Sequence, residues 1–274
     1  YKLSGSTYTC SKQGTNDYLP LYEAKMMHQF DHRWANAGKD EDAEEVVIDW
    51  NKKQDINFLV QPRYWVSKQE VDKKIPASWK HNWLMGWRDI TNNTNERSLL
   101  SSLIPRTAVG NTITLFFAEI DKLSSIYLLS IFNSIIFDYL VRISIGGSHL
   151  SQHFFKQLPI LPPEYFQTFR IGKETLAQFV LPRAARLTFT AVDLEAAAKE
   201  MGFSVASITE DERRQIGAEL DAAFFLAYKI PVDEVDYIME TFPITKRKDE
   251  AKFGDFRTKI MVLDEYRKLK GKVC

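Results

Sequence analysis

The sequence predicts an α+β fold, with a mixed α+β domain over residues 1–165 followed by a mainly helical domain over residues 166–274. Three observations predict it: short β-like segments early in the chain, helical periodicity late in the chain, and a proline-rich change of texture between them at Pro159, Pro162 and Pro163. A chain of 274 residues is long enough for two ordinary domains. Its content of 45% hydrophobic and 26% charged residues is typical of a chain that folds.

The elements of the first domain follow from local composition. Residues 46–48, 58–60 and 112–117 are rich in residues that favour a half-buried pleat, and we expect short strands there. Apolar residues then recur at helical spacing over residues 121–145, on nearly every side, so this segment should be a buried helix. The glycine pair that follows would end it.

The second domain shows clear helix signals. Thr209 and Glu212 form a capping box, which predicts a helix over residues 210–228. A short helix should start at Pro231 and be ended by Phe242-Pro243, and a last helix should span residues 255–270.

Several compartments and partners are disfavoured by composition. The two cysteines, Cys10 and Cys274, lie at opposite ends of the chain, which indicates a reducing compartment and therefore a cytoplasmic protein. The longest apolar stretch, residues 126–137, is too short and too polar to span a bilayer, and the chain starts with no basic segment of a secretory signal. We therefore expect no membrane partner. The start at Tyr1, without Met, indicates a fragment of a longer protein.

Basic and acidic residues are equal in number over the whole chain, but they are distributed unevenly along the sequence. Thirty-six basic residues match thirty-six acidic ones, whereas residues 61–110 hold eight basic residues against four acidic ones. Five aromatic residues lie among these cations: Tyr64, Trp65, Trp79, Trp83 and Trp87. Aromatic rings between cations can form a nucleic-acid surface, because cations bind phosphates and rings stack on bases. They can equally be a core with a charged rim, which composition alone favours.

Motifs of known chemistry are weak in this sequence. Residues 161–165 have a Pro-Pro-aromatic pattern like the loops of amino-methyltransferases, but Leu161 cannot accept a hydrogen bond as the Asn or Asp of those loops does, so we interpret the segment as a turn that closes a domain. His28 and His32 are four residues apart, as zinc ligands on a helix would be, but a third ligand is missing, which favours a structural or DNA-facing role.

A metal-dependent nuclease is a further possibility. Asp17 with Glu23 and Lys25 resembles a set in which two carboxylates hold a metal and a lysine assists water. The same spacing recurs at Glu250 and Lys252, which shows how easily it arises by chance. Phosphate-binding glycine loops, nucleophile elbows and HExxH motifs are absent from the sequence. We predict no catalytic and no metal-binding residues in this chain.

Several motifs in a shared order resemble the C-terminal, target-recognition region of large DNA adenine-N6 methyltransferases of type IIG-like restriction-modification and phage-defence systems. The resemblance covers the chain from about residue 19. Its motifs are residues 19–33 (LPLYEAKMMHQFDHR), 86–91 (GWRDIT), 95–97 (NER), 104–105 (IP), 110–112 (GNT), 132–134 (FNS), 137–140 (FDYL), 146–150 (GGSHL), 157–160 (QLPI), 219–225 (ELDAAFF), 242–244 (FPI), 247–250 (RKDE) and 257–259 (RTK).

The resemblance implies a module that recognises double-stranded DNA for a catalytic domain located upstream in the parent chain. In that family the upstream domain binds S-adenosylmethionine and carries an Asn-Pro-Pro-Tyr loop, and neither pattern is present here. We therefore expect no cofactor in this chain and no methylation by it alone, whereas the parent would be a site-specific DNA adenine-N6 methyltransferase. Its partners would be double-stranded DNA, the catalytic domain and other subunits of a defence system.

The residues expected to contact DNA are those able to bind base edges or phosphates. Arg suits guanine and Asn suits adenine, while other cations and backbone N–H groups fix the register on phosphates. The predicted contacts are Lys25, His28, Arg63, Trp87, Arg88, Asn92, Asn93, Asn95, Arg97, Arg106, Asn111, Thr112, Gly146, Gly147, Ser148 and His149.

Two of these predictions have structural alternatives. Arg88 could instead pair with Asp89 or Glu96 as an internal tie. The glycine pair before Ser148 could bring backbone N–H groups to a phosphate, or it could simply end a helix with Ser148 capping the next segment. Two other function classes also stay open: a protein-interaction module of a phage-defence complex, and the metal-dependent nuclease.

Overall fold

The fold of the computed structural model is α+β, as the sequence predicts. The structure describes residues 2–4, 7–9, 17–38, 46–145, 149–150 and 155–273. The chain forms two compact units that alternate along the sequence: unit 1 contains Tyr1–Asp89, Ser101–Ile120 and Ala185–Thr209, and unit 2 contains Ile90–Leu100, Asp121–Ala184 and Glu210–Cys274. Residue 165, where the sequence predicts a domain boundary, lies inside unit 2.

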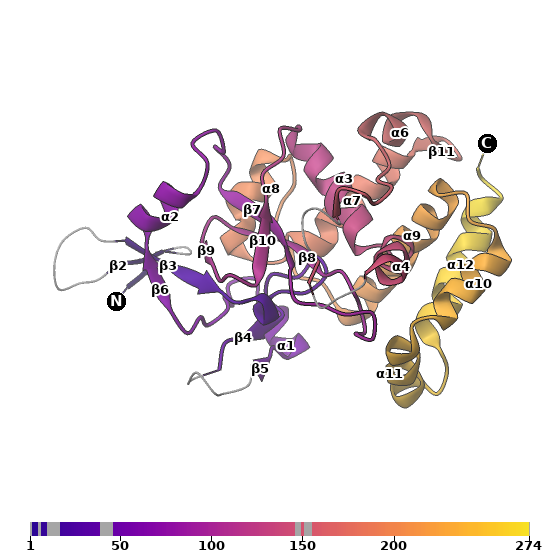
Figure 1. The fold of residues 1–274 in the computed structure, drawn as a ribbon, viewed down its shortest axis with the longest axis horizontal. Helices are drawn as coiled ribbons and strands as arrows, with labels where there is room; N and C mark the ends of the chain where they lie inside the picture. The colour runs from indigo at the N-terminus through magenta and orange to yellow at the C-terminus, as the bar shows by residue number, and fades with distance from the viewer. Residues whose placement is uncertain are drawn as a thin grey trace. The chain divides into compact units, whose positions relative to one another are not determined.

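Unit 1 is built on two sheets (Figure 1). The first joins β1 (Lys2–Ser4), β2 (Thr7–Thr9), β3 (Asp17–Tyr22) and β6 (Trp65–Ser67) in that order, and β9 (Ala108–Val109) pairs with β3 in parallel. The second is antiparallel, with β7 (Trp83–Arg88) between β10 (Ile113–Phe116) and β8 (Ser101–Pro105). A separate two-stranded pair joins β4 (Ala35–Asn36) to β5 (Val46–Val47).

The central strand β7 decides how the aromatic, basic part of the sequence folds. Trp83 is fully buried and Trp87 is 2% exposed, because β7 is covered on both faces and flanked by a strand on each edge. The Nε1–H group of Trp79, also buried, donates to the carbonyl oxygen of Trp83 at 2.7 Å. These three tryptophans therefore belong to the core of unit 1, which was one of the two interpretations of the sequence. Trp87, predicted to contact DNA, is thus a core residue.

Short helices complete unit 1. They are η1 (Ala24–Met26), α1 (Trp50–Lys53), α2 (Lys68–Lys74), η2 (Val192–Leu194) and α8 (Glu195–Glu200). Strands are present at two of the three predicted places, as β5 and β10, whereas residues 58–60 form none. The Phe58 carbonyl there accepts a hydrogen bond from the buried Arg33 guanidinium at 2.7 Å, not from a neighbouring strand.

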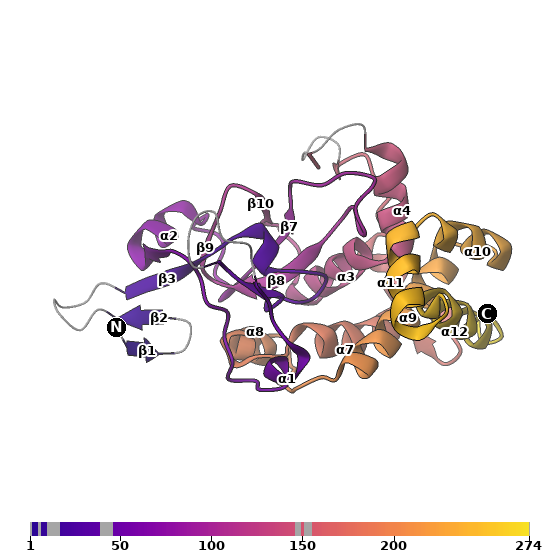
Figure 2. The same ribbon diagram turned by 90° about the horizontal axis from the view of Figure 1, so that it is seen from below.

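Unit 2 is mainly helical (Figures 1 and 2). It contains α3 (Lys122–Asn133), α4 (Ile135–Ser144), α6 (Pro163–Thr168), most of α7 (Leu176–Thr188), α9 (Glu210–Ala227), α10 (Val232–Glu240), α11 (Pro243–Phe253) and α12 (Arg257–Lys270), with a hairpin of β11 (Arg170–Ile171) and β12 (Glu174–Thr175). Helices α9 and α12 pack along each other (Figure 1). Its core includes the stacked and edge-on rings of Phe132, Phe137 and Phe155.

The long helix predicted over residues 121–145 is two helices, α3 and α4, bent by 62° (Figure 2). Ser134 at the break is extended, and its hydroxyl donates to the Ile131 carbonyl at 2.7 Å while accepting from the Phe137 backbone N–H. One serine thus ends the first helix and caps the second. Of the helices the structure describes, none reaches membrane-spanning length and apolarity by itself; the bent pair does so only when taken together.

The tail agrees closely with the sequence pattern. Helices α9, α10 and α12 match the three predicted ones to within two residues at each end. Pro243 does not only close α10: it stands in the first turn of α11, which the sequence analysis missed. Pro163 likewise begins α6, where we expected a turn. Both prolines occupy the helix position where a missing backbone N–H costs nothing.

Gly86 is required by the close approach of β7 and β10. A β-carbon there would lie 2.7 Å from the backbone oxygen of Thr114. We therefore expect Gly86→Ala to lower the free energy of unfolding by about 1–3 kcal/mol in urea denaturation, the usual cost of overpacking. Gly217→Ala on α9 is the control: its β-carbon meets no atom within 4 Å, and better helix propensity should raise stability by up to about 1 kcal/mol. Equal effects of the two substitutions would contradict this account.

Candidate functional site

Unit 2 presents a polar turn, residues 92–95, that we call the amide loop. All four of its residues are exposed. The Asn92 side-chain oxygen accepts from the backbone N–H of Thr94 at 2.9 Å and from its hydroxyl at 2.7 Å, an Asx turn that fixes the backbone locally. Asn93 and Asn95 stand on this turn, so the loop holds predicted base-contacting side chains in contact with solvent.

The amide loop is anchored by one buried carboxylate, Asp138 on α4. Asp138 is fully buried, and its Oδ1 atom accepts from the backbone N–H groups of Ser98 and Leu99, each at 2.7 Å. Its Oδ2 atom lies 3.2 Å from Arg97 Nε and 3.6 Å from Arg142. The Thr91 hydroxyl donates to the Ser98 carbonyl at 2.7 Å, which joins the two ends of the loop.

Arg142 holds the loop from the other side. It donates to the backbone carbonyls of Asn95 at 2.9 Å and Glu96 at 3.1 Å, and its guanidinium lies 4.3 Å from the centre of the Phe242 ring. The guanidinium therefore donates to loop carbonyls and also lies within ion-pair distance of the Asp138 carboxylate.

Arg97, predicted to contact DNA, is an internal tie of unit 2. Its side chain is 10% exposed, and besides Asp138 it donates to the backbone carbonyl of Asn133 at 2.7 Å. Spacing alone did not distinguish it from the neighbouring exposed polar residues, because its partner Asp138 is 41 positions away.

Exposed cations of α11 lie beside the amide loop. Lys248 forms an ion pair with Glu96, which places α11 next to the segment 90–100. Arg247 is exposed, and in the described part of the chain it forms no ion pair. The sequence analysis missed these residues as site candidates; the run of three cations from Lys246 to Lys248 was the signal that could have revealed them.

Two arginines of unit 1 that were predicted to contact DNA, Arg88 and Arg106, form hydrogen bonds within unit 1 instead. Arg88 donates through Nε to the Met27 carbonyl at 3.0 Å. Arg106 donates to Asp72 Oδ1 at 3.1 and 3.2 Å and to the Trp79 carbonyl at 3.2 Å. These arginines therefore hold unit 1 together, in the structural role that the sequence analysis weighed for Arg88.

Other predicted contacts are partly enclosed. The Arg63 side chain is 10% exposed and lies 3.5 Å from Glu23, and half-buried His28 stacks on Trp34 with ring centres 4.2 Å apart. Lys25 in η1 is exposed.

The remaining predicted contacts fall in three places. Asn111 is exposed and Thr112 is half-buried in the turn between β9 and β10 of unit 1. His149 is exposed and its backbone bridges to Ile90 within unit 2. Gly146, Gly147 and Ser148 lie outside the described residues.

The histidine and carboxylate motifs do not assemble into a metal site. His32 is fully buried, and its Nε2 atom lies 2.8 Å from Asp193 Oδ1. Glu23 lies beside Arg63, as described above. Over the residues whose placement is described, no group of three His, Cys, Asp or Glu side chains could hold a metal ion; the Asp17 side chain is not among them.

A buried ionic cluster organises unit 1. The Arg33 guanidinium donates to four backbone carbonyls, those of Lys53, Asp55, Phe58 and Thr190, at 2.7–2.8 Å. Lys53 Nζ pairs with Asp31 Oδ2 at 2.6 Å, and both side chains are almost completely buried. These bonds join segments from both ends of unit 1 in a single network.

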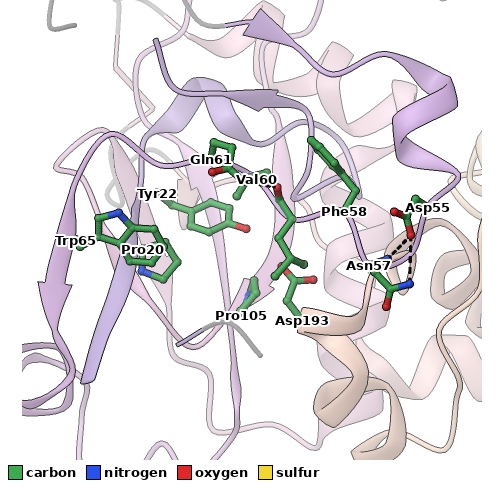
Figure 3. A pocket seen from close by; sticks show the side chains of 11 residues that line it. Pro20, Tyr22, Asp55, Asn57, Phe58, Val60, Gln61, Trp65, Pro105 and Asp193 are labelled. Atoms are coloured by element: carbon green, nitrogen blue, oxygen red, sulfur yellow. Dashed lines mark hydrogen bonds between the residues drawn. The ribbon is translucent and has the colours of Figure 1, made fainter. Parts of the chain in front are cut away.

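A cavity of about 270 Å³ borders this cluster (Figure 3). Its lining residues are Pro20, Tyr22, Asp55, Asn57, Phe58, Leu59, Val60, Gln61, Trp65, Pro105 and Asp193. Tyr22 is 1% exposed, and within the described part of the chain its hydroxyl has no hydrogen-bond partner. Burial and the nearby Asp193 charge raise the pKa of Tyr22 well above its ordinary value, so the hydroxyl keeps its proton.

Two carboxylates of unit 2 have raised pKa values. Burial raises the pKa of Asp138, although Arg97 and Arg142 oppose the shift. Burial also raises the pKa of Asp221 to about 6, against the opposing effects of Arg97 and of a 2.7 Å hydrogen bond from the Ile135 backbone N–H at the start of α4.

The raised pKa of Asp221 predicts a pH dependence of stability. Between about pH 4 and pH 6 folded Asp221 keeps a proton that the unfolded chain releases, so this group stabilises the fold at low pH and its contribution is lost as the pH rises through 6. Asp221→Asn keeps the acceptor for Ile135 but does not titrate. The quantity to measure is the difference in free energy of unfolding, Asp221→Asn minus the unsubstituted chain, by urea denaturation. We expect this difference to rise by at most about 3 kcal/mol between pH 4 and pH 7. A difference that is constant with pH would contradict the assignment.

Comparison with known proteins adds no relative: no family model, no curated protein and no solved structure matches this chain.

Proposed function

We infer that the chain recognises double-stranded DNA for a DNA adenine-N6 methyltransferase, with the amide loop of unit 2 as the element that contacts bases. The observation that carries this is a turn of exposed amide side chains on a backbone anchored to the buried Asp138. An asparagine can bind adenine through two hydrogen bonds, at N6 and N7. Such readout needs a contact loop held by a rigid scaffold, as this loop is.

Phosphate contacts would come from the cations beside the loop. Arg247 and Lys248 of α11 are exposed, and the Lys248–Glu96 pair brings this helix to the loop. Phosphate contacts set the register, and base contacts then supply the sequence preference. In this proposal Arg247 and Lys248 take the place of four residues that the sequence predicts as DNA contacts. Arg97 has internal partners in unit 2, and Arg63, Arg106 and Trp87 have theirs in unit 1.

The rest of the proposed function follows the family resemblance. Methyl transfer from S-adenosylmethionine would be performed by a catalytic domain upstream in the parent chain, so the chain by itself should bind without methylating. This function would place it in the cytoplasm, with other defence-system subunits as further partners.

The test is binding of the full chain to a pool of random-site DNA duplexes, followed by sequencing of the selected duplexes across a salt series. We expect a preferred sequence and an affinity that falls steeply with salt, because bound phosphates release counterions. Selection of no sequence at any salt concentration would contradict the proposed function and favour a protein-interaction module.

Two substitutions separate base readout from phosphate binding. Asn93→Ala should reduce discrimination at one base position by about 1–3 kcal/mol, whereas Arg247→Ala should weaken binding to all sequences and reduce the salt slope by about 1. Asn51→Ala is the matched control, an exposed asparagine of α1 in unit 1 that should change neither quantity. If Asn93→Ala and Asn51→Ala behave alike, the amide loop does not read bases.

A further inference from the structure

The cavity of unit 1 has polar groups that the DNA-recognition function does not use. Tyr22 and Asp193 both line it, and Figure 3 shows the Tyr22 hydroxyl directed toward the interior of the lining, with Asp193 below it. The Asp193 side chain is 3% exposed. A buried hydroxyl with no hydrogen-bond partner among the described residues is costly unless a ligand or water binds it, and a buried carboxylate lies at the same cavity.

The Asp193 carboxylate is held in place by a histidine that does not line the cavity. His32, fully buried, contacts Asp193 Oδ1 through Nε2 at 2.8 Å, whereas its Nδ1 atom has no hydrogen-bond partner in the residues that the structure describes. His32 does not line the cavity, so it acts as a positioning residue for the carboxylate. Asp193 can therefore present acceptor lone pairs to a molecule in the cavity.

The other side chains that line the cavity favour a ligand with a flat, apolar ring face. Trp65 and Pro20 lie together at one side of the cavity and Phe58 at another (Figure 3). A volume of about 270 Å³ is just below the range for pockets that bind drug-sized ligands, which starts at about 300 Å³. The cavity is thus sized for a single planar ring system with a small substituent.

These features together define the hydrogen-bonding edge of the ligand. The protonated Tyr22 hydroxyl can donate to a carbonyl oxygen, and Asp193 can accept from N–H groups. A guanine base has both on one edge: the O6 acceptor, then N1–H, then the exocyclic amino group. Adenine has no carbonyl, and hypoxanthine has the carbonyl and N1–H but lacks the amino group.

We propose that the Tyr22–Asp193 cavity of unit 1 binds a guanine base, with O6 accepting from the Tyr22 hydroxyl and N1–H with the amino group donating to the Asp193 carboxylate. This site is independent of the amide loop of unit 2 and of the function proposed for it. The base could belong to a free nucleotide or to an unpaired guanine in a nucleic acid, since both present the same edge.

The test is calorimetric titration of the full chain with GMP, and with IMP and AMP as matched ligands. We expect GMP to bind at least tenfold more tightly than IMP, which lacks the amino group, and AMP to show no binding at millimolar concentration. Equal binding of GMP and AMP, or no binding of GMP, would overturn the proposal.

Tyr22→Phe separates ligand binding from folding. Because the hydroxyl has no partner among the residues whose placement is described, its removal should leave thermal stability unchanged or raised, while GMP affinity falls about tenfold. Asp193→Asn should abolish GMP binding, but it also disturbs the His32 pair, so Tyr22→Phe is the decisive variant. Unchanged GMP affinity of Tyr22→Phe would overturn the proposal.

An oligonucleotide distinguishes the two sources of the base. A single-stranded oligothymidylate with one central guanine should compete with GMP, whereas all-thymine oligonucleotide should not. Tighter binding of the guanine oligonucleotide than of GMP assigns the site to nucleic acid, and weaker binding assigns it to free nucleotide; competition by the all-thymine oligonucleotide would overturn guanine recognition. Tyr22→Phe should leave the duplex preference measured above unchanged, so the two functions can fail separately.

Discussion

The buried carboxylate of Asp138 is the constraint on which the organisation of unit 2 depends. A buried negative charge is tolerated only when hydrogen bonds and opposite charges surround it, and Asp138 has two backbone N–H donors and two arginines. Those donors come from the segment 90–100, whereas Asp138 itself belongs to α4. Satisfying one charge therefore fixes the path of the loop that carries the exposed amides.

Unit 1 uses the same principle with the signs exchanged. The buried Arg33 guanidinium is satisfied by four backbone carbonyls from loops and short elements far apart in the sequence. These loops have no strand partners of their own, so the guanidinium serves them as a common hydrogen-bond donor. The same region forms the wall of the cavity, where the Tyr22 hydroxyl has no hydrogen-bond partner among the described residues.

Exposure, more than residue type, separates structural from functional candidates in this chain. Arg97 and Arg106 have the chemistry of DNA contacts, but Arg97 is bound to the buried Asp138 and to a backbone carbonyl, and Arg106 to the half-buried Asp72 and to backbone carbonyls. Arg247 and Asn93 have the same chemistry on exposed positions. Arg247 forms no ion pair among the described residues, so a chain with no net charge can still present an exposed cation that no carboxylate neutralises.

The sequence by itself determined the α+β class, the strand at β10 and the three tail helices α9, α10 and α12, because periodicity and capping are local signals within one element. It also singled out Asn92, Asn93 and Asn95 of the amide loop as possible DNA contacts, since their segment is too polar to belong to a core. Only the tertiary structure decided which arginines are internal, that Ser134 breaks the long apolar helix, and that Tyr22, His32 and Asp193 meet at one cavity. The arginine ties and the cavity depend on partners tens to more than a hundred positions away, and local sequence patterns carry no information about such distant pairings. The hydrogen bonds of Ser134 are local, but the helix that begins after it is also capped by Asp221, which accepts from the Ile135 backbone N–H from 86 positions away.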